Sequence, residues 1–156
     1  MIRTHRIYLD TNVYFRPFDD QTIPGIRGES DAFLRILKAI LEGRVTAMCS
    51  DILHYEVFLT RDAGKKAKVE SLLSLCEERI EQSALILHWS EKIENACRLS
   101  GRDSIHVISA TFGRAVSYYT CDQELIKKSR KIASFLFSNG LGTLSILNPC
   151  EFKLVP

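Results

Sequence analysis

Short apolar runs alternate with segments of helical periodicity along this chain of 156 residues. The runs that we expect to form strands are residues 7–9, 45–49, 84–87, 118–121 and 143–147. Strands that alternate with amphipathic helices are typical of a parallel sheet covered by helices on both faces. The sequence therefore predicts an α/β fold with three layers, α/β/α, around a central, mostly parallel sheet.

The clearest helical pattern begins after Ser30, which can cap a helix that continues until Gly43. Its apolar residues recur at helical spacing and are Phe33, Ile36, Leu37, Ile40 and Leu41. We expect further helices at about residues 52–59, 65–82, 90–101, 103–113 and 122–136. Residues 16–28 contain prolines and glycines without an apolar period, which indicates a loop.

The composition is that of an ordinary globular protein, with 46% apolar and 26% charged residues, and we expect one domain over residues 1–156. The aliphatic runs are far shorter than the roughly 20 residues that cross a bilayer. The first residues contain no apolar signal-peptide core, so we expect a cytoplasmic protein without membrane association. The five cysteines never adopt the C-x-x-C spacing of a zinc site, so we interpret them as buried small hydrophobic residues.

Four acidic residues stand near the ends of expected strands or the starts of expected helices. Asp10 follows the first strand, Glu56 lies in the helix after the second, Asp103 opens a helix, and Asp122 follows the fourth strand. Ligands of open parallel sheets bind beyond the carboxyl ends of the strands. Four carboxylates gathered there would repel one another unless a cation were present, and their hard oxygen atoms suit Mg²⁺ or Mn²⁺.

Each acid also has a simpler interpretation when it is taken alone. Asp103 and Asp122 stand where helix caps are expected, Asp10 can form an Asx-turn, and Glu56 can be an exposed helix residue. The metal-site hypothesis depends on all four lying at or near one end of the sheet. The overall charge of only +2 implies that any polyanion is bound by a local patch rather than by a global field.

Short motifs in this order resemble those of PIN domains, a family of metal-dependent nucleases that includes the VapC-type toxins. The motifs are Asp10-Thr11-Asn12-Val13, the helix residue Glu56, Asp103-Ser104-Ile105-His106, Thr120-Cys121-Asp122, and the ending Ile146-Leu147-Asn148-Pro149. The resemblance implies that Asp10, Glu56, Asp103 and Asp122 bind metal and carry out catalysis. It implies supporting roles for Thr11, Asn12 and Thr120, and it places His106 close to the site.

The same resemblance implies an endoribonuclease that uses Mg²⁺ or Mn²⁺ to hydrolyse phosphodiester bonds of single-stranded RNA. The toxin branch of the family would add an antitoxin protein as partner and a homodimer. A basic strip after Asp122 is a candidate RNA contact, although charge runs on helices are usually solvated faces. The strip consists of Lys127, Lys128, Arg130 and Lys131.

Two other functions stay open at this stage. Phosphoryl transfer through an aspartyl-phosphate also places an aspartate after the first strand. It is disfavoured because Asn12 and Tyr14 occupy the positions where a D-x-D-x-T pattern requires Asp and Thr. The second alternative is a catalytically idle PIN-like domain that binds RNA or a protein partner.

Overall fold

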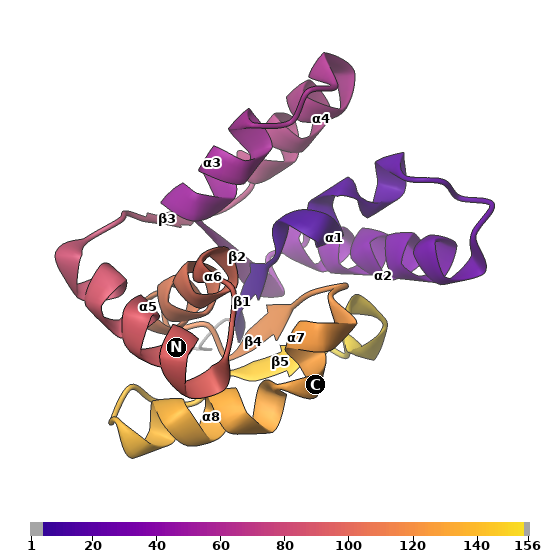
Figure 1. Ribbon diagram of the computed structural model, residues 1–156. Helices are drawn as coiled ribbons and strands as arrows, with labels where there is room; N and C mark the ends of the chain where they lie inside the picture. The colour runs from indigo at the N-terminus through magenta and orange to yellow at the C-terminus, as the bar shows by residue number, and fades with distance from the viewer. Residues whose placement is uncertain (1–4, 155–156) are drawn as a thin grey trace.

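The computed structural model describes residues 5–154, whose strands form one parallel sheet (Figure 1). The sheet has the strand order β3-β2-β1-β4-β5, and every neighbouring pair runs parallel. Its strands are β1 (His5–Leu9), β2 (Val45–Ser50), β3 (Glu78–Ile80), β4 (Ser117–Tyr119) and β5 (Ser145–Leu147). From the central strand β1, the chain continues to β2 and β3 on one side of the sheet and then to β4 and β5 on the other side. The carboxyl end of β1 therefore lies at a topological switch point.

Helices cover both faces of this sheet and complete the expected three layers (Figure 1). One face packs against α1 (Thr11–Phe15), α2 (Pro24–Leu41), α3 (Asp51–Phe58) and α4 (Ala63–Leu73). The other packs against α5 (Ala84–Cys97), α6 (Gly101–Phe112), α7 (Gln123–Lys127) and α8 (Ser129–Ser138). The α/β/α fold predicted from the alternation of elements is therefore confirmed.

Strand β1 supplies side chains to both cores because successive residues of a strand point to opposite faces. Ile7 and Leu9 belong to the core beneath α1–α4, whereas Tyr8 belongs to the core beneath α5–α8. All three side chains are fully buried. The alternation thus places one phenol, that of Tyr8, on the face where α6 packs.

The loop expected at residues 16–28 is largely helical, so that prediction was wrong. Residues Arg16–Phe18 form a 3₁₀ helix, and α2 begins at Pro24 rather than after Ser30. Proline suits the first position of a helix because its missing N–H would be unpaired there anyway. Arg16 stabilises the connection through ion pairs with Asp19 and Glu29.

The strand expected at residues 84–87 was also wrong, because these residues open helix α5. Ser83 caps that helix by accepting a hydrogen bond from the N–H of Ile86, and Ile86 is buried while Leu85 and Leu87 are exposed. Ser90, where the expected helix over residues 90–101 would begin, lies inside α5. The third strand is instead the short edge strand β3, within the region expected to be the end of a helix.

Several boundaries differ by a few residues from those expected. Helix α6 begins at Gly101 with Ser100 as its cap, so Asp103 is its third residue and does not cap it. Strands β4 and β5 are shorter than expected. Of the five free cysteines, Cys150 is exposed and Cys76 is partly exposed, which corrects the expectation that all are buried. Within residues 5–154, no helix has the length and apolar character needed to cross a membrane.

Candidate active site

Asp10 lies directly after β1 at the centre of the sheet, and its carboxylate is oriented by hydrogen bonds. Its side chain caps α1, where Oδ1 accepts a hydrogen bond of 2.7 Å from the Thr11 N–H. Its Oδ2 accepts a hydrogen bond of 2.8 Å from the Thr120 hydroxyl. Only 6% of Asp10 is exposed, so this carboxylate is both nearly buried and fixed in direction.

Asn12 ties the loop after β1 to the segment after β4. Its Nδ2 donates to the Thr120 hydroxyl oxygen over 3.2 Å, and it lies 3.4 Å from Asp10 Oδ2. Its Oδ1 accepts a hydrogen bond of 3.0 Å from the Cys121 N–H. Thr11 supports Asp10 through its backbone N–H, since its buried hydroxyl has no hydrogen-bond partner in the described part of the chain.

Asp122 follows β4 and caps α7, as the simpler interpretation of this residue predicted. Its Oδ1 accepts hydrogen bonds from the N–H groups of Glu124 and Leu125 at 2.9 and 3.3 Å. Its own N–H donates to the Thr120 hydroxyl oxygen over 3.1 Å. Thr120 therefore connects the backbone of Asp122 to the carboxylate of Asp10.

Asp103 lies in the first turn of α6, close enough to the other two aspartates to be affected by their charges. Burial raises the pKa of its carboxyl above the usual value, and the negative charges of Asp10 and Asp122 raise it further. A hydrogen bond with Ser100 and the proximity of His106 act in the opposite direction. Carboxylates from the loops after β1 and β4 and from the start of α6 thus interact at one end of the sheet.

Glu56, on α3, contacts His106 rather than standing free beside the aspartates. The Nε2 atom of His106 contacts the Glu56 carboxylate and lies 3.9 Å from Asp10 Oδ1. Burial disfavours the charged imidazolium, but the hydrogen bond to Glu56 and the charges of Asp10, Glu56 and Asp103 raise the pKa of His106 overall. The partner that a half-buried Glu56 requires is therefore supplied within the protein by His106.

Sequence reasoning missed two buried hydroxyl groups behind His106. The phenol oxygen of Tyr8 lies 2.7 Å from His106 Nδ1 and 2.5 Å from Ser50 Oγ. The ring of Tyr8 stacks on Tyr118 with ring centroids 5.2 Å apart. The available signal was a tyrosine between the aliphatic residues Ile7 and Leu9 of β1, but its contact with His106 joins residues 98 positions apart.

The donor set of this site suits a hard divalent cation, since it consists of carboxylate oxygens. Burial raises the pKa of the Asp103 carboxyl, and the charges of Asp10 and Asp122 add to that rise. The side chains are not already arranged as a complete metal-binding site. Across residues 5–154, no three His, Cys, Asp or Glu side chains are grouped so that they could hold an ion as they stand. Glu56 in particular is engaged by His106.

The basic strip after Asp122 lies on α7, α8 and the residue between them. Lys127 is largely exposed and pairs with Glu124 at 2.8 Å, and Lys128 donates to the carbonyl oxygen of Arg98 at the end of α5. Arg130 and Lys131 are exposed. Two of the four cations thus have contacts within the protein.

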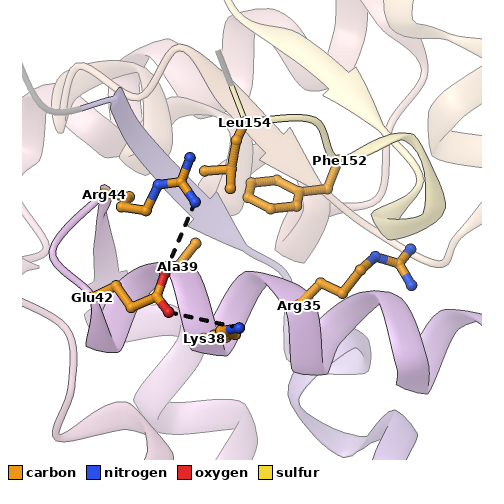
Figure 2. Close-up of a pocket in the computed structure, with 7 residues that line it drawn as sticks. All are labelled: Arg35, Lys38, Ala39, Glu42, Arg44, Phe152 and Leu154. Atoms are coloured by element: carbon orange, nitrogen blue, oxygen red, sulfur yellow. Dashed lines mark ion pairs between the residues drawn. The ribbon is translucent and has the colours of Figure 1, made fainter. Parts of the chain in front are cut away.

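A pocket of about 320 Å³ lies between α2 and the C-terminal segment, and none of the four acids lines it (Figure 2). Phe152, Leu154 and Ala39 supply its apolar surface. Its charged rim consists of Arg35, Lys38, Glu42 and Arg44, with Glu42 paired to Lys38 at 3.8 Å and to Arg44 at 3.9 Å. Because it holds no cluster of carboxylates, we assign the candidate active site to the acidic end of the sheet.

Comparison with known proteins supports the fold. No protein-family model and no curated protein matches the sequence. A chain of FitAB bound to an IR36 DNA fragment is similar with a TM-score of 0.56 and 20% identity, over 94% of this chain and 97% of that chain. A chain of VapBC2 from Rickettsia felis, bound to a DNA fragment from their promoter, is similar with a TM-score of 0.56 and 15% identity, over 90% of this chain and 98% of that chain. The likeness shows that this chain shares the fold of chains in these two complexes.

Proposed function

We propose that this protein is a metal-dependent endoribonuclease that hydrolyses single-stranded RNA at the acidic end of its sheet. The observation that carries the proposal is the convergence of three aspartates: Thr120 joins Asp10 to Asp122 by hydrogen bonds, and the charges of both add to the burial that raises the pKa of the Asp103 carboxyl. Such a cluster is unfavourable in the absence of a cation and is suited to Mg²⁺ or Mn²⁺. The VapC-like fold agrees with this chemistry but does not by itself establish it.

In this proposal Asp10, Asp103 and Asp122 hold the ion, and Glu56 completes the set. A divalent ion in such a site lowers the pKa of a bound water and stabilises charge on phosphate oxygens. Thr120 and Asn12 keep the Asp10 carboxylate in a fixed direction, and Thr11 contributes its backbone N–H. His106 keeps Glu56 next to Asp10. The strip of Lys127, Lys128, Arg130 and Lys131 is the candidate contact for the RNA backbone.

An antitoxin partner is part of the proposal. The two similar structures are FitAB and VapBC2 complexes bound to DNA. In this chain, α3 and the residue that follows it expose three large apolar side chains, Tyr55, Phe58 and Leu59. Exposed apolar groups that cluster on one element are typical of protein interfaces. We therefore propose a toxin that acts in the cytoplasm as a homodimer and is held by an antitoxin.

The test is cleavage of a fluorescently labelled single-stranded RNA by purified protein with Mg²⁺, with Mn²⁺ and with a chelator. We expect cleavage only with the metals, and we expect Asp10→Asn to reduce it by about 100-fold or more, since the ion contributes several kcal/mol to the transition state. Circular dichroism checks that the variant is folded.

Asp62→Asn is the matched control because Asp62 also caps a helix, α4, and asparagine caps nearly as well as aspartate. This variant should cleave RNA at the wild-type rate. Cleavage that persists in chelator or in Asp10→Asn would refute the proposal. RNA binding in chelator without cleavage when Mn²⁺ is restored would instead favour the idle domain.

A further inference from the structure

A buried chain of hydrogen-bonding groups leads from β2 through β1 to the histidine that contacts Glu56. Ser50 Oγ lies 2.5 Å from Tyr8 Oη, and Tyr8 Oη lies 2.7 Å from His106 Nδ1. Ser50 and Tyr8 are 0% exposed and His106 is 1% exposed. At the far end, His106 Nε2 contacts the Glu56 carboxylate. No bulk water is available to these groups, so their protons must be satisfied by one another.

Counting the protons of these groups shows which atom donates in each hydrogen bond. In the part of the chain that the structure describes, Ser50 Oγ has two partners, the N–H of Leu53 and the Tyr8 hydroxyl. The Leu53 N–H is a donor, so the Ser50 proton has only Tyr8 Oη as acceptor. The phenol proton of Tyr8 must then be donated to His106 Nδ1. A nitrogen that accepts a hydrogen bond carries no proton, so the proton of a neutral His106 lies on Nε2 and points to Glu56.

If each of these hydrogen bonds were donated in the opposite direction, the Ser50 hydroxyl would be left without an acceptor. If Nδ1 carried a proton, it would donate to Tyr8, and Tyr8 would donate to Ser50. The proton of Ser50 would then face no acceptor, which is unfavourable for a buried donor. If in addition Nε2 lost its proton, its lone pair would face the Glu56 carboxylate. The observed contacts therefore favour the Nε2–H form of His106.

We propose that Tyr8 is a positioning residue, which donates a hydrogen bond to Nδ1 and so holds His106 in the Nε2–H tautomer that binds Glu56 beside Asp10. The assignment of the tautomer depends only on the contacts of the metal-free protein. Its consequence for RNA cleavage rests on the proposed nuclease function. Tyr8 acts through His106 and does not itself face the RNA.

The first test uses nitrogen chemical shifts of His106 in ¹⁵N-histidine-labelled protein, without metal and at alkaline pH, where a histidine is neutral. We expect the shift of an unprotonated ring nitrogen at Nδ1 and of a protonated one at Nε2. A protonated Nδ1 would overturn the proposal. Because this measurement needs no variant and no activity, it decides the tautomer even if the protein does not cleave RNA.

The second test removes the phenol oxygen with Tyr8→Phe, which keeps the ring that stacks on Tyr118. The Nδ1 shift should lose the effect of the hydrogen bond, and the signal of a protonated Nδ1 should appear, because the phenol no longer favours the Nε2–H form. Tyr118→Phe is the matched control, since among the described residues the hydroxyl of Tyr118 makes no hydrogen bond to Ser50, Tyr8 or His106. That control should leave the His106 shifts unchanged. Equal responses to the two variants would overturn the proposal.

The third test separates positioning from a merely structural role through cleavage kinetics. Tyr8→Phe should lower kcat by about 10- to 100-fold, as loss of a residue that orients a metal ligand does, with little change in KM. In a Glu56→Gln background the same change should have almost no further effect, because Tyr8 acts through the contact between His106 and Glu56. Additive effects in this double-mutant cycle would overturn the proposal.

Discussion

The hydroxyl of Thr120 donates a hydrogen bond of 2.8 Å to Oδ2 of Asp10, joining the ends of two neighbouring strands. The same hydroxyl oxygen accepts hydrogen bonds from the Asp122 N–H and from Asn12. One threonine therefore fixes both the direction of the Asp10 carboxylate and the position of the next aspartate. The acidic end of the sheet is organised around a neutral residue.

Removing this hydroxyl should destabilise the protein. Thr120→Val keeps the size of the side chain but leaves a nearly buried carboxylate and a backbone N–H without their partner. We expect a loss of about 1–3 kcal/mol in the free energy of unfolding, measured by urea denaturation in chelator. Thr120→Ser keeps the hydroxyl and should lose clearly less. If the two variants were equally unstable, the methyl group and not the hydrogen bond would be responsible.

Asp103→Asn should change how stability depends on pH. The pKa of the Asp103 carboxyl is raised in the folded protein by burial and by Asp10 and Asp122. A raised pKa of an acid means that its contribution to stability is fully present below the unfolded pKa and is lost as pH rises through the folded pKa. Asparagine has no charge to lose, so the variant should gain stability relative to wild type as pH rises in that range.

The measurement is urea unfolding of both proteins in chelator, from acidic to neutral pH. The difference in free energy of unfolding between variant and wild type should increase toward neutral pH. A difference that did not vary with pH would contradict the origin that we assign to the raised pKa.

Adding Mn²⁺ should raise the melting temperature of the wild-type protein. A ligand that binds only the folded state stabilises it by about 2.7 kcal/mol at a concentration of 100 times its Kd. The gain should be lost in Asp10→Asn and kept in Asp62→Asn, as measured by thermal unfolding with and without the metal. An equal rise in all three proteins would indicate binding elsewhere.

Gly113, the residue after α6, should not tolerate a side chain. A Cβ atom there would lie 2.9 Å from Met48 Sδ and 3.0 Å from Ile80 Cδ1, so these two buried or partly buried side chains would have to move. We expect Gly113→Ala to cost about 1–3 kcal/mol in the free energy of unfolding, as overpacking does. Gly28→Ala has no atom within 4 Å of the new Cβ inside α2 and should stabilise the protein by about 0.5–1 kcal/mol. Similar effects of the two changes would contradict this steric explanation.

The layered fold could be predicted because periodicity and strand-ending residues agree along the chain. The prediction of individual elements failed where a short apolar run is compatible with two structures. Residues 84–87 fit a strand or a helix equally well, and the cap at Ser83 decides for a helix. The prediction also failed at Pro24, because proline is typical of loops but here occupies the first position of α2.

The candidate site could be predicted only to the extent that it depends on position along the chain. Asp10 and Asp122 follow strands that lie side by side, so their proximity follows from the topology. The contacts of His106 with Glu56 and Tyr8 span 50 and 98 positions and depend on how α3 and α6 pack over the sheet. No local pattern encodes that packing. The catalytic role of the four acids stays a prediction.

Helix α3 turns two different faces to its surroundings. Tyr55 and Phe58 point into solvent with 51% and 65% of their surface exposed, while Glu56 between them contacts His106. A helix is about 10–12 Å thick including its side chains. A protein bound to the outer face would thus be separated from His106 by the width of one helix of 8 residues. Because Glu56 belongs to the same short helix, any displacement of α3 by such a partner would also displace Glu56.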